Sequence, residues 1–372
     1  GLMLAVYWIG AYLIDAAEAL DKLTTFSNMV VFSSYSIQVI MSFLLLSMVF
    51  VLWPRADVSA QRVLEVIDTE PMVTDGTQDA GKPGEEGEIE FRNVSFAYPD
   101  SRHAMLEGVN FKAKKGQTVA FIGSTGSGKS SLINLVPRFY DVSAGQVLVD
   151  GVDVREYDLK ALRDKIGYVP QQSVLFKGTV ASNVSYGDDV NGASSADVEM
   201  ADTSTPAGRK REAELIAAGK RAEGAAMPTE QMNRVKAAAG VAQATEFVER
   251  MDGTYTAPIA QGGSNVSGGQ KQRLSIARAV YRHPEILIFD DSFSALDFKT
   301  DREVRDALAK EAKGSTKLIV AQRIGTIMNA DRIIVLDDGK VVGQGTHQEL
   351  LDTCDVYRQI AESQLSQSEL TA

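Results

Sequence analysis

A glycine-rich run between two apolar segments constrains this chain more than any other feature. It reads Gly123-Ser124-Thr125-Gly126-Ser127-Gly128-Lys129-Ser130. The apolar run 118–122 before it predicts a buried strand, and the apolar-periodic run 131–136 after it predicts a helix start. Glycines let backbone N–H groups approach a phosphate, and a helix N-terminus adds partial positive charge there. The spacing therefore predicts a phosphate-binding loop, in which Lys129 meets the terminal phosphates and the Ser130 hydroxyl holds Mg²⁺.

Composition excludes several other classes of protein. The formal net charge is -11, whereas a nucleic-acid binder needs a basic face. The single cysteine, Cys354, excludes a disulfide scaffold and any multi-cysteine metal site. The three histidines are far apart in the sequence, which argues against a zinc enzyme.

The N-terminal part of the chain has the composition of a membrane domain. Residues 29–53 contain no charged side chain and exceed the ~20 residues that cross a bilayer. A fully buried core helix is the alternative interpretation. The apolar segment 2–14 is too short for a full span, and it begins at Gly1 without an initiator methionine. We therefore expect it to be the end of a membrane helix whose beginning is missing, so that the chain is an N-terminally truncated fragment.

Polar residues inside the expected span leave two possibilities open. Such residues face other helices or a watery cavity rather than lipid, so they either line a transport path or hydrogen-bond between helices. They are Ser33, Ser34, Ser36 and Gln38. Arg55, just after Pro54, favours a cytoplasmic location for that end of the span. Residues 54–67 are expected to carry the helix into the cytoplasm.

The remaining chain divides into a linker and one large domain. Residues 68–88 are rich in Gly, Pro, Asp and Glu, which is typical of a linker. Short β-type runs alternate with helical segments over 89–366, which predicts an α/β domain with parallel strands. The polar region 187–227 interrupts this pattern. It is expected to be a solvated, partly disordered insertion, with a regulatory or partner-binding role as the alternative.

Two further motifs complete the chemistry. The apolar run 286–289 ends in Asp290, and a carboxylate at a strand end lies where open α/β sheets bind ligands. Asp290 is therefore expected to hold Mg²⁺ beside Ser130. The run 265–273 places a serine and two glycines at a helix start, which forms a second anion-binding end. One nucleotide does not need two such ends, but a dimer does if each subunit covers the other's ATP.

Over residues 89–365 the sequence resembles the ATP-binding cassette family. The resemblance implies an α/β P-loop NTPase domain, the ABC nucleotide-binding domain, preceded by membrane α-helices. The signature motif corresponds to Ser267, Gly268, Gly269 and Gln270, with Val266 where leucine is usual. ATP binding is implied for Tyr98, Gly123, Ser124, Thr125, Gly126, Ser127, Gly128, Lys129, Ser130, Ser131 and Gln171. The Mg²⁺ ligands implied are Ser130, Gln171 and Asp290.

Other positions matter for catalysis and for the dimer. Asp297 corresponds to the loop that crosses the dimer interface. Asp291 stands where the family usually has its general-base glutamate, and Gln322 stands where it has a histidine. Asp291 is one methylene shorter, and Gln322 cannot carry a positive charge. Gln261 replaces a glutamate that is common ahead of the signature. Asp291 and Gln322 are thus the expected catalytic pair, at a site that binds ATP well and hydrolyses it slowly.

By this resemblance the chain is one half of an exporter in the cell membrane, with its cassette in the cytoplasm. The implied cofactors are ATP and Mg²⁺. The implied partners are a second half-transporter, the lipid bilayer and an unidentified cargo, but no nucleic acid. The favoured partner is a different chain that supplies a competent site, completed by Ser267–Gln270. The alternatives are a homodimeric exporter, an ATP-binding regulatory subunit without hydrolysis, and a soluble cassette ATPase of DNA repair or translation.

Overall fold

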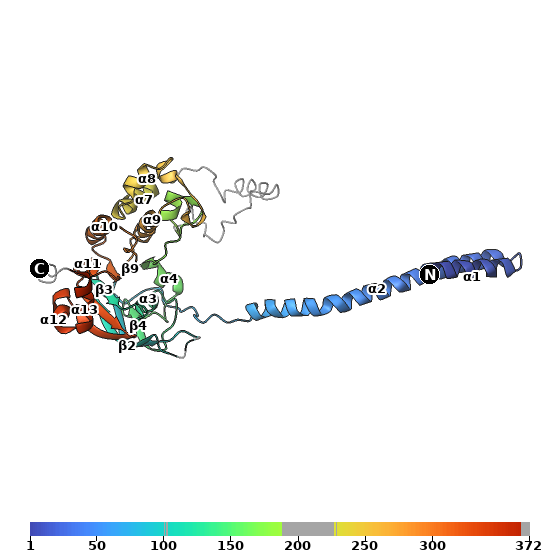
Figure 1. The fold of residues 1–372 in the computed structure, drawn as a ribbon, viewed down its shortest axis with the longest axis horizontal. Coiled ribbons are helices and arrows are strands. Elements are labelled where there is room, and N and C mark those ends of the chain that lie inside the picture. Colours follow the sequence, from blue (N-terminus) through green and yellow to red (C-terminus); the bar gives the residue numbers. More distant parts are fainter. Residues whose placement is uncertain (100, 102, 188–226, 228, 366–372) are drawn as a thin grey trace. The chain divides into compact units, whose positions relative to one another are not determined.

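The computed structural model of the chain describes residues 1–99, 101, 103–187, 227 and 229–365. These residues form two compact units, divided between Pro71 and Met72 (Figure 1). The expected insertion at 187–227 lies outside the described residues except for its two end residues.

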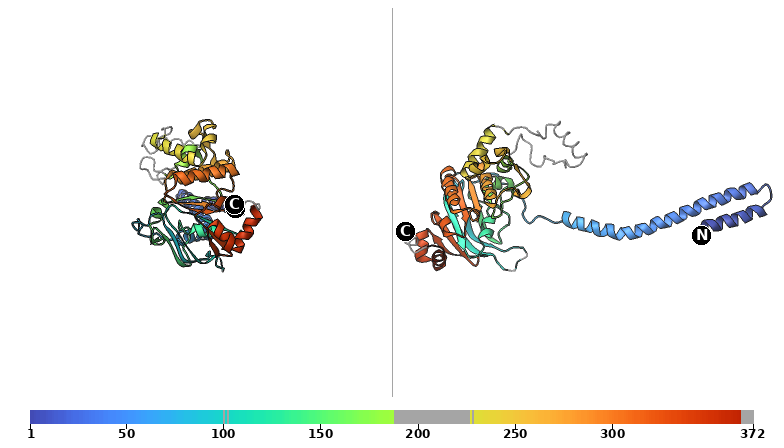
Figure 2. Two further views of the ribbon diagram at one scale, coloured as in Figure 1. Left: turned by 90° about the vertical axis from the view of Figure 1, so that its left-hand side faces the viewer. Right: turned by 45° about the horizontal axis from the view of Figure 1, so that its top comes forward.

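The first unit is a hairpin of two helices, α1 (Leu2–Ala16) and α2 (Lys22–Ile67). Figure 2 shows α1 folded back along the beginning of α2. Helix α2 has 46 residues and continues through Pro54, so the expected span 29–53 and its extension 54–67 belong to one helix. By length and composition, α2 can cross a membrane, and none of its most apolar window is buried in the structure.

Two of the four polar residues named in the expected span, Ser33 and Ser36, bond within their own helix. The hydroxyls of Ser33 and Ser36 donate to the carbonyl oxygens of Met29 and Phe32, both at 2.8 Å. Such bonds to the carbonyl four residues back satisfy a hydroxyl without a partner on another helix. These two serines can therefore lie in an apolar environment at little cost.

The larger sheet of the second unit has the strand order β12-β11-β3-β10-β9-β6. Its neighbours pair in parallel, except that β12 runs antiparallel to β11. Strands β9 and β10 are buried along their whole length, as in sheets covered on both faces. The bounds are β3 (Thr118–Gly123), β6 (Ile166–Val169), β9 (Ile286–Asp290), β10 (Thr316–Val320), β11 (Arg332–Asp337) and β12 (Lys340–Gly345). The predicted parallel α/β domain is confirmed.

A smaller antiparallel sheet has the order β2-β1-β4-β5. Its strands are β1 (Ile89–Phe96), β2 (Leu106–Ala113), β4 (Ala144–Val149) and β5 (Val152–Asp153). Phe91 and Phe111 stack across β1 and β2 with ring centroids 4.5 Å apart. Their apolar cluster also includes Leu132 and Ile133 of helix α3 (Lys129–Asn134), so it supports the start of the helix that follows the glycine-rich loop.

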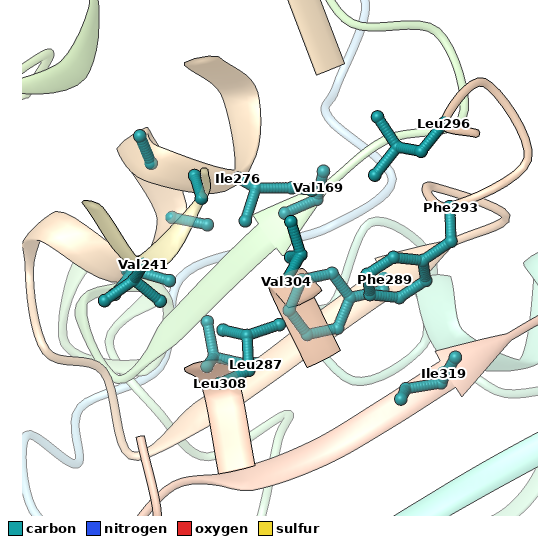
Figure 3. Close-up of a cluster of buried hydrophobic side chains, with 14 of the residues drawn as sticks. Val169, Val241, Ile276, Leu287, Phe289, Phe293, Leu296, Val304, Leu308 and Ile319 are labelled. Atoms are coloured by element: carbon teal, nitrogen blue, oxygen red, sulfur yellow. The ribbon is translucent and has the colours of Figure 1, made fainter. Parts of the chain in front are cut away.

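The other large core joins the main sheet to a group of helices. Phe289 of β9 lies against Phe293, with ring centroids 5.1 Å apart, and the same cluster includes Val304 and Ile276 (Figure 3). Among the described residues after β4, the helices are α4 (Leu159–Asp164), α5 (Val180–Val184), α7 (Thr229–Val241), α8 (Thr245–Glu249), α9 (Gly268–Tyr281), α10 (Phe298–Glu311), α11 (Ile324–Ile327), α12 (His347–Thr353) and α13 (Asp355–Gln364). The short elements are β7 (Gly178–Thr179), η3 (Thr254–Thr256), β8 (Pro258–Ile259) and η4 (Gln261–Gly263).

The segment expected to be a linker, 68–88, is attached to the second unit for most of its length. The N–H of Gly76 donates to the Tyr157 carbonyl at 3.0 Å, and the N–H of Gly87 donates to Asp150 Oδ1 at 2.7 Å. Asp75 Oδ1 accepts the N–H of Leu159 at 2.7 Å, at the first residue of α4. Hydrogen bonds to main-chain N–H groups need no apolar side chains, which is why composition alone gives no sign of them.

Candidate nucleotide-binding site

Four neighbouring strands bring the candidate residues to one edge of the main sheet. In the order β3, β10, β9 and β6, their carboxyl ends lead to the glycine-rich loop, to Gln322, to Asp290 with Asp291, and to Gln171. The carboxyl ends of parallel strands meet at the same edge, where open α/β sheets bind ligands. Residues far apart in the sequence therefore line one cleft of about 290 Å³.

The glycine-rich loop holds its lysine by two main-chain carbonyls and one side-chain hydroxyl. Lys129 Nζ donates to the carbonyls of Gly123 at 2.9 Å and Ser124 at 2.6 Å, and to Ser127 Oγ at 3.2 Å. Burial lowers the pKa of the Lys129 ammonium, and the charges of Asp291 and Asp290 oppose this effect. The lysine is thus held beside the cleft that it lines.

The α3 N-terminus has no side-chain cap, because its N-cap residue is Gly128. Gly128 has φ 94° and Gly126 has φ 86°, a region that glycine adopts without strain. A Cβ atom on Gly126 would meet nothing within 4 Å, so this residue borders open space. The loop therefore presents backbone N–H groups with room for a ligand beside them.

Ser130 and Asp290 form a pair of oxygen groups beside the loop. The Ser130 hydroxyl donates to Asp290 Oδ1 at 2.7 Å. Burial raises the pKa of the Asp290 carboxyl, and its bonds with Ser130 and Tyr168 and the Lys129 charge oppose the rise. Gln171 lines the same cleft. Hydroxyl, carboxylate and carboxamide oxygens are the hard ligands that Mg²⁺ takes, so these side chains fit that ion.

Asp291 and Gln322 are in direct contact. Gln322 Nε2 donates to Asp291 Oδ2 at 2.9 Å, and Gln171 Nε2 lies 3.5 Å from the same oxygen. Asp291 has φ 46°, a left-handed conformation that aspartate tolerates better than most residues. Its pKa is raised by burial and by the neighbouring Asp290 charge. The two residues expected to be catalytic therefore act as one hydrogen-bonded unit.

Tyr98 forms the aromatic wall of the cleft. Its hydroxyl lies 2.8 Å from Ser131 Oγ, and its ring packs edge-on against Phe96 and Tyr140, at 4.8 and 5.2 Å between centroids. Met105 also lines the cleft, as does Val320, and sequence reasoning missed both. An apolar residue at a strand end is too common to mark a site.

No residue of the signature motif and no Asp297 atom lines this cleft. Ser267 is the N-cap of α9 and forms a capping box, with Ser267 N–H donating to Gln270 Oε1 at 2.9 Å. Asp297 caps α10 by accepting the Thr300 N–H at 3.0 Å. Gln261 Oε1 accepts the Lys177 N–H at 3.3 Å.

These features define a P-loop nucleotide-binding domain, in which the glycine-rich loop, Lys129, Ser130 and the strand-end Asp290 line one cleft. A family model described as ABC transporter matches residues 106–294, which is just over half of the chain. The chain belongs to the ABC transporter family, and its cassette is an ATP-binding domain.

Curated relatives extend the similarity into the helical hairpin. An uncharacterised ABC transporter ATP-binding protein of Mycobacterium tuberculosis is 40% identical over 363 residues, covering 97% of this chain and 55% of that protein. An ATP-dependent lipid A-core flippase of Syntrophus aciditrophicus is 37% identical over 311 residues, covering 84% of this chain and 45% of that protein. The chain thus spans about half the length of these relatives.

Among solved structures, the chain is similar to a bacterial Atm1-family ABC exporter with ATP bound. The TM-score is 0.73 at 30% sequence identity, over 98% of this chain and 57% of that one. The similarity covers the helical hairpin as well as the cassette.

Proposed function

We propose that this chain is one half of an ATP-driven exporter that binds MgATP in the cleft and hydrolyses it slowly there. The observation that carries the proposal is the 2.9 Å bond between Asp291 and Gln322. These two residues depart from the family pattern, and the nucleotide-binding residues around them do not. Slow chemistry at an otherwise intact site follows from this combination.

Each side chain of the cleft has a role in the proposed reaction. Tyr98 stacks on the adenine ring, and Lys129 with the loop N–H groups binds the phosphates. Asp291 orients the attacking water, and Gln322 donates a hydrogen bond to the γ-phosphate. Bound Mg²⁺, held by Ser130, Gln171 and Asp290, would supply positive charge beside the phosphates.

Two physical effects make this site slow. Asp291 is one methylene shorter than glutamate, and a misplacement of about 1 Å costs on the order of 10²-fold in rate. Gln322 is neutral, so it stabilises the developing negative charge less than a protonated histidine does. The Gln322 amide also donates to Asp291, and this bond competes with donation to the γ-phosphate.

The exporter is proposed to be a pair of half-transporters in the cell membrane, with the cassettes in the cytoplasm. The Ser267–Gln270 start of α9 does not line the cleft of its own chain, and Ser267 and Gly268 are exposed, which leaves this helix start available to the partner's ATP. The partner supplies the glutamate and histidine of the fast site. Closure of the two cassettes on ATP, passed on through Gln171 and its neighbours, switches the membrane helices from inward to outward access.

The experiment is ATP hydrolysis by the purified pair after the partner's glutamate is replaced by glutamine. Turnover is expected to fall on the order of 10²-fold, whereas Asp291→Asn in this chain changes it little. Turnover near the wild-type rate in the first variant would contradict the asymmetric assignment. Full activity of this chain alone, abolished by Asp291→Asn, would instead establish the homodimer.

A further inference from the structure

We propose that Gln364, the last residue of α13, is a positioning residue that fixes the segment carrying Gln322. This inference rests on the proposed function, because it is there that Gln322 acts on the γ-phosphate. Gln364 lies 42 residues from Gln322 in the sequence and bonds to its main chain.

One carboxamide bridges the backbone on both sides of Arg323. Gln364 Nε2 donates to the carbonyl oxygen of Gln322 at 2.8 Å, and Gln364 Oε1 accepts the N–H of Ile324 at 2.9 Å. Both bonds are made to main-chain atoms, so they fix the direction in which the chain leaves β10. That direction decides where the Gln322 side chain starts.

The helix that follows Gln322 needs this outside partner. The first N–H groups of a helix lack partners within it, and Ser, Thr, Asp or Asn at the N-cap usually supplies one. The N-cap of α11 is Arg323, which makes no side-chain cap. Its guanidinium lies over the Phe298 ring instead, 5.2 Å from the centroid. Ile324 is fully buried, so Gln364 supplies the acceptor that its N–H requires.

Helix α13 gives Gln364 a fixed base. Tyr357 and Ala361 are both fully buried in the core. The Tyr357 hydroxyl lies 2.7 Å from His347 Nδ1, and Arg358 Nε donates to the Leu351 carbonyl at 2.7 Å. Helix α13 is thus attached to α12 and to the core, and its last residue reaches the segment that carries Gln322.

The effect of Gln364 should be on chemistry rather than on ATP binding. Gln322 is bonded to Asp291, so a shift of the segment moves both residues. The phosphate-binding groups Lys129 and Ser130 begin helix α3, which follows a different strand, β3. Loss of Gln364 should therefore lower kcat and leave the KM for ATP unchanged.

The test uses the full transporter in which the partner's glutamate is replaced by glutamine, so that turnover at this chain's site is measured. Gln364→Met keeps the side-chain length and removes the carboxamide. We expect kcat to fall about 3- to 10-fold with KM within about twofold, the scale of one lost hydrogen bond. The matched control is Gln359→Met, at an exposed position of the same helix. In a Gln322→Ala background, Gln364→Met should lower kcat no further.

A second readout separates this inference from the proposed function. Amide hydrogen exchange of the peptide 322–328 should be faster in Gln364→Met than in Gln359→Met. Unchanged exchange, or an equal loss of kcat in the Gln322→Ala background, would overturn the positioning role. An unchanged kcat in Gln322→Ala alone would overturn the role that the proposed function gives to Gln322, while the exchange rates still decide whether Gln364 holds the segment.

Discussion

Asp290 and Asp291 are neighbours in the sequence, yet they belong to differently built ends of the cleft. Asp290 ends strand β9 and bonds to Ser130, at the start of α3. Asp291 leaves the strand with φ 46° and bonds to Gln322, an exposed side chain on the segment after β10. Lys129, the residue before Ser130, is 9% exposed.

This difference separates the part of the cleft that binds the nucleotide phosphates from the part that acts on the attacking water. We call the glycine-rich loop, Lys129, Ser130 and Asp290 the phosphate end of the cleft. Its groups bond to one another, so a change there disturbs several contacts at once. At the Gln322 end, Asp291 and Gln322 are joined to each other by a side-chain bond, so they can depart from the family pattern without disturbing the loop. The comparison predicts that the two ends respond differently to substitution.

The largest expected effect is at the phosphate end. Lys129→Ala should lower the affinity for ATP about 10- to 150-fold, the scale of a lost charged hydrogen bond. The fold should survive, because burial lowers the pKa of Lys129 and its charge is therefore not a source of folding stability. Equilibrium titration with ATP measures the effect, with the exposed Lys313→Ala as control. Equal affinities of the two variants would break the assignment of the phosphate end.

The phosphate end could be predicted from the sequence because its signals are local. The glycine spacing, the strand before it and the aspartate at a strand end are each visible within a few residues. The contact between Gln171 and Asp291 is not, because these residues are 120 apart and meet only through the order of strands β6 and β9. Gln364 gives no signal either, since a single glutamine in a C-terminal helix matches no motif.

The second-largest expected effect is at the end of the cleft formed by Asp291 and Gln322. Asp291→Glu combined with Gln322→His should raise hydrolysis at this site by up to about 10²-fold, because the longer carboxylate reaches the water and the histidine can carry charge. Phosphate release by the pair with the partner's glutamate replaced by glutamine measures it. Asp291→Glu alone is the matched control and should give only part of the gain. An unchanged rate in the double variant would show that another step limits turnover.

The smallest expected effect is a difference in ATP affinity between variants of the two aspartates. Asp290→Asn should weaken ATP binding about tenfold when Mg²⁺ is present, a change of about 1.4 kcal/mol, because a neutral amide oxygen attracts a divalent cation less than a carboxylate. Asp291→Asn should lower the affinity much less, since the shortest side-chain bond of Asp291 is to Gln322. Titration with ATP in EDTA is the control, where both variants should bind like the wild type. An equal loss in both variants with Mg²⁺ would mean that the two ends share the metal, and the separation of binding from chemistry would then fail.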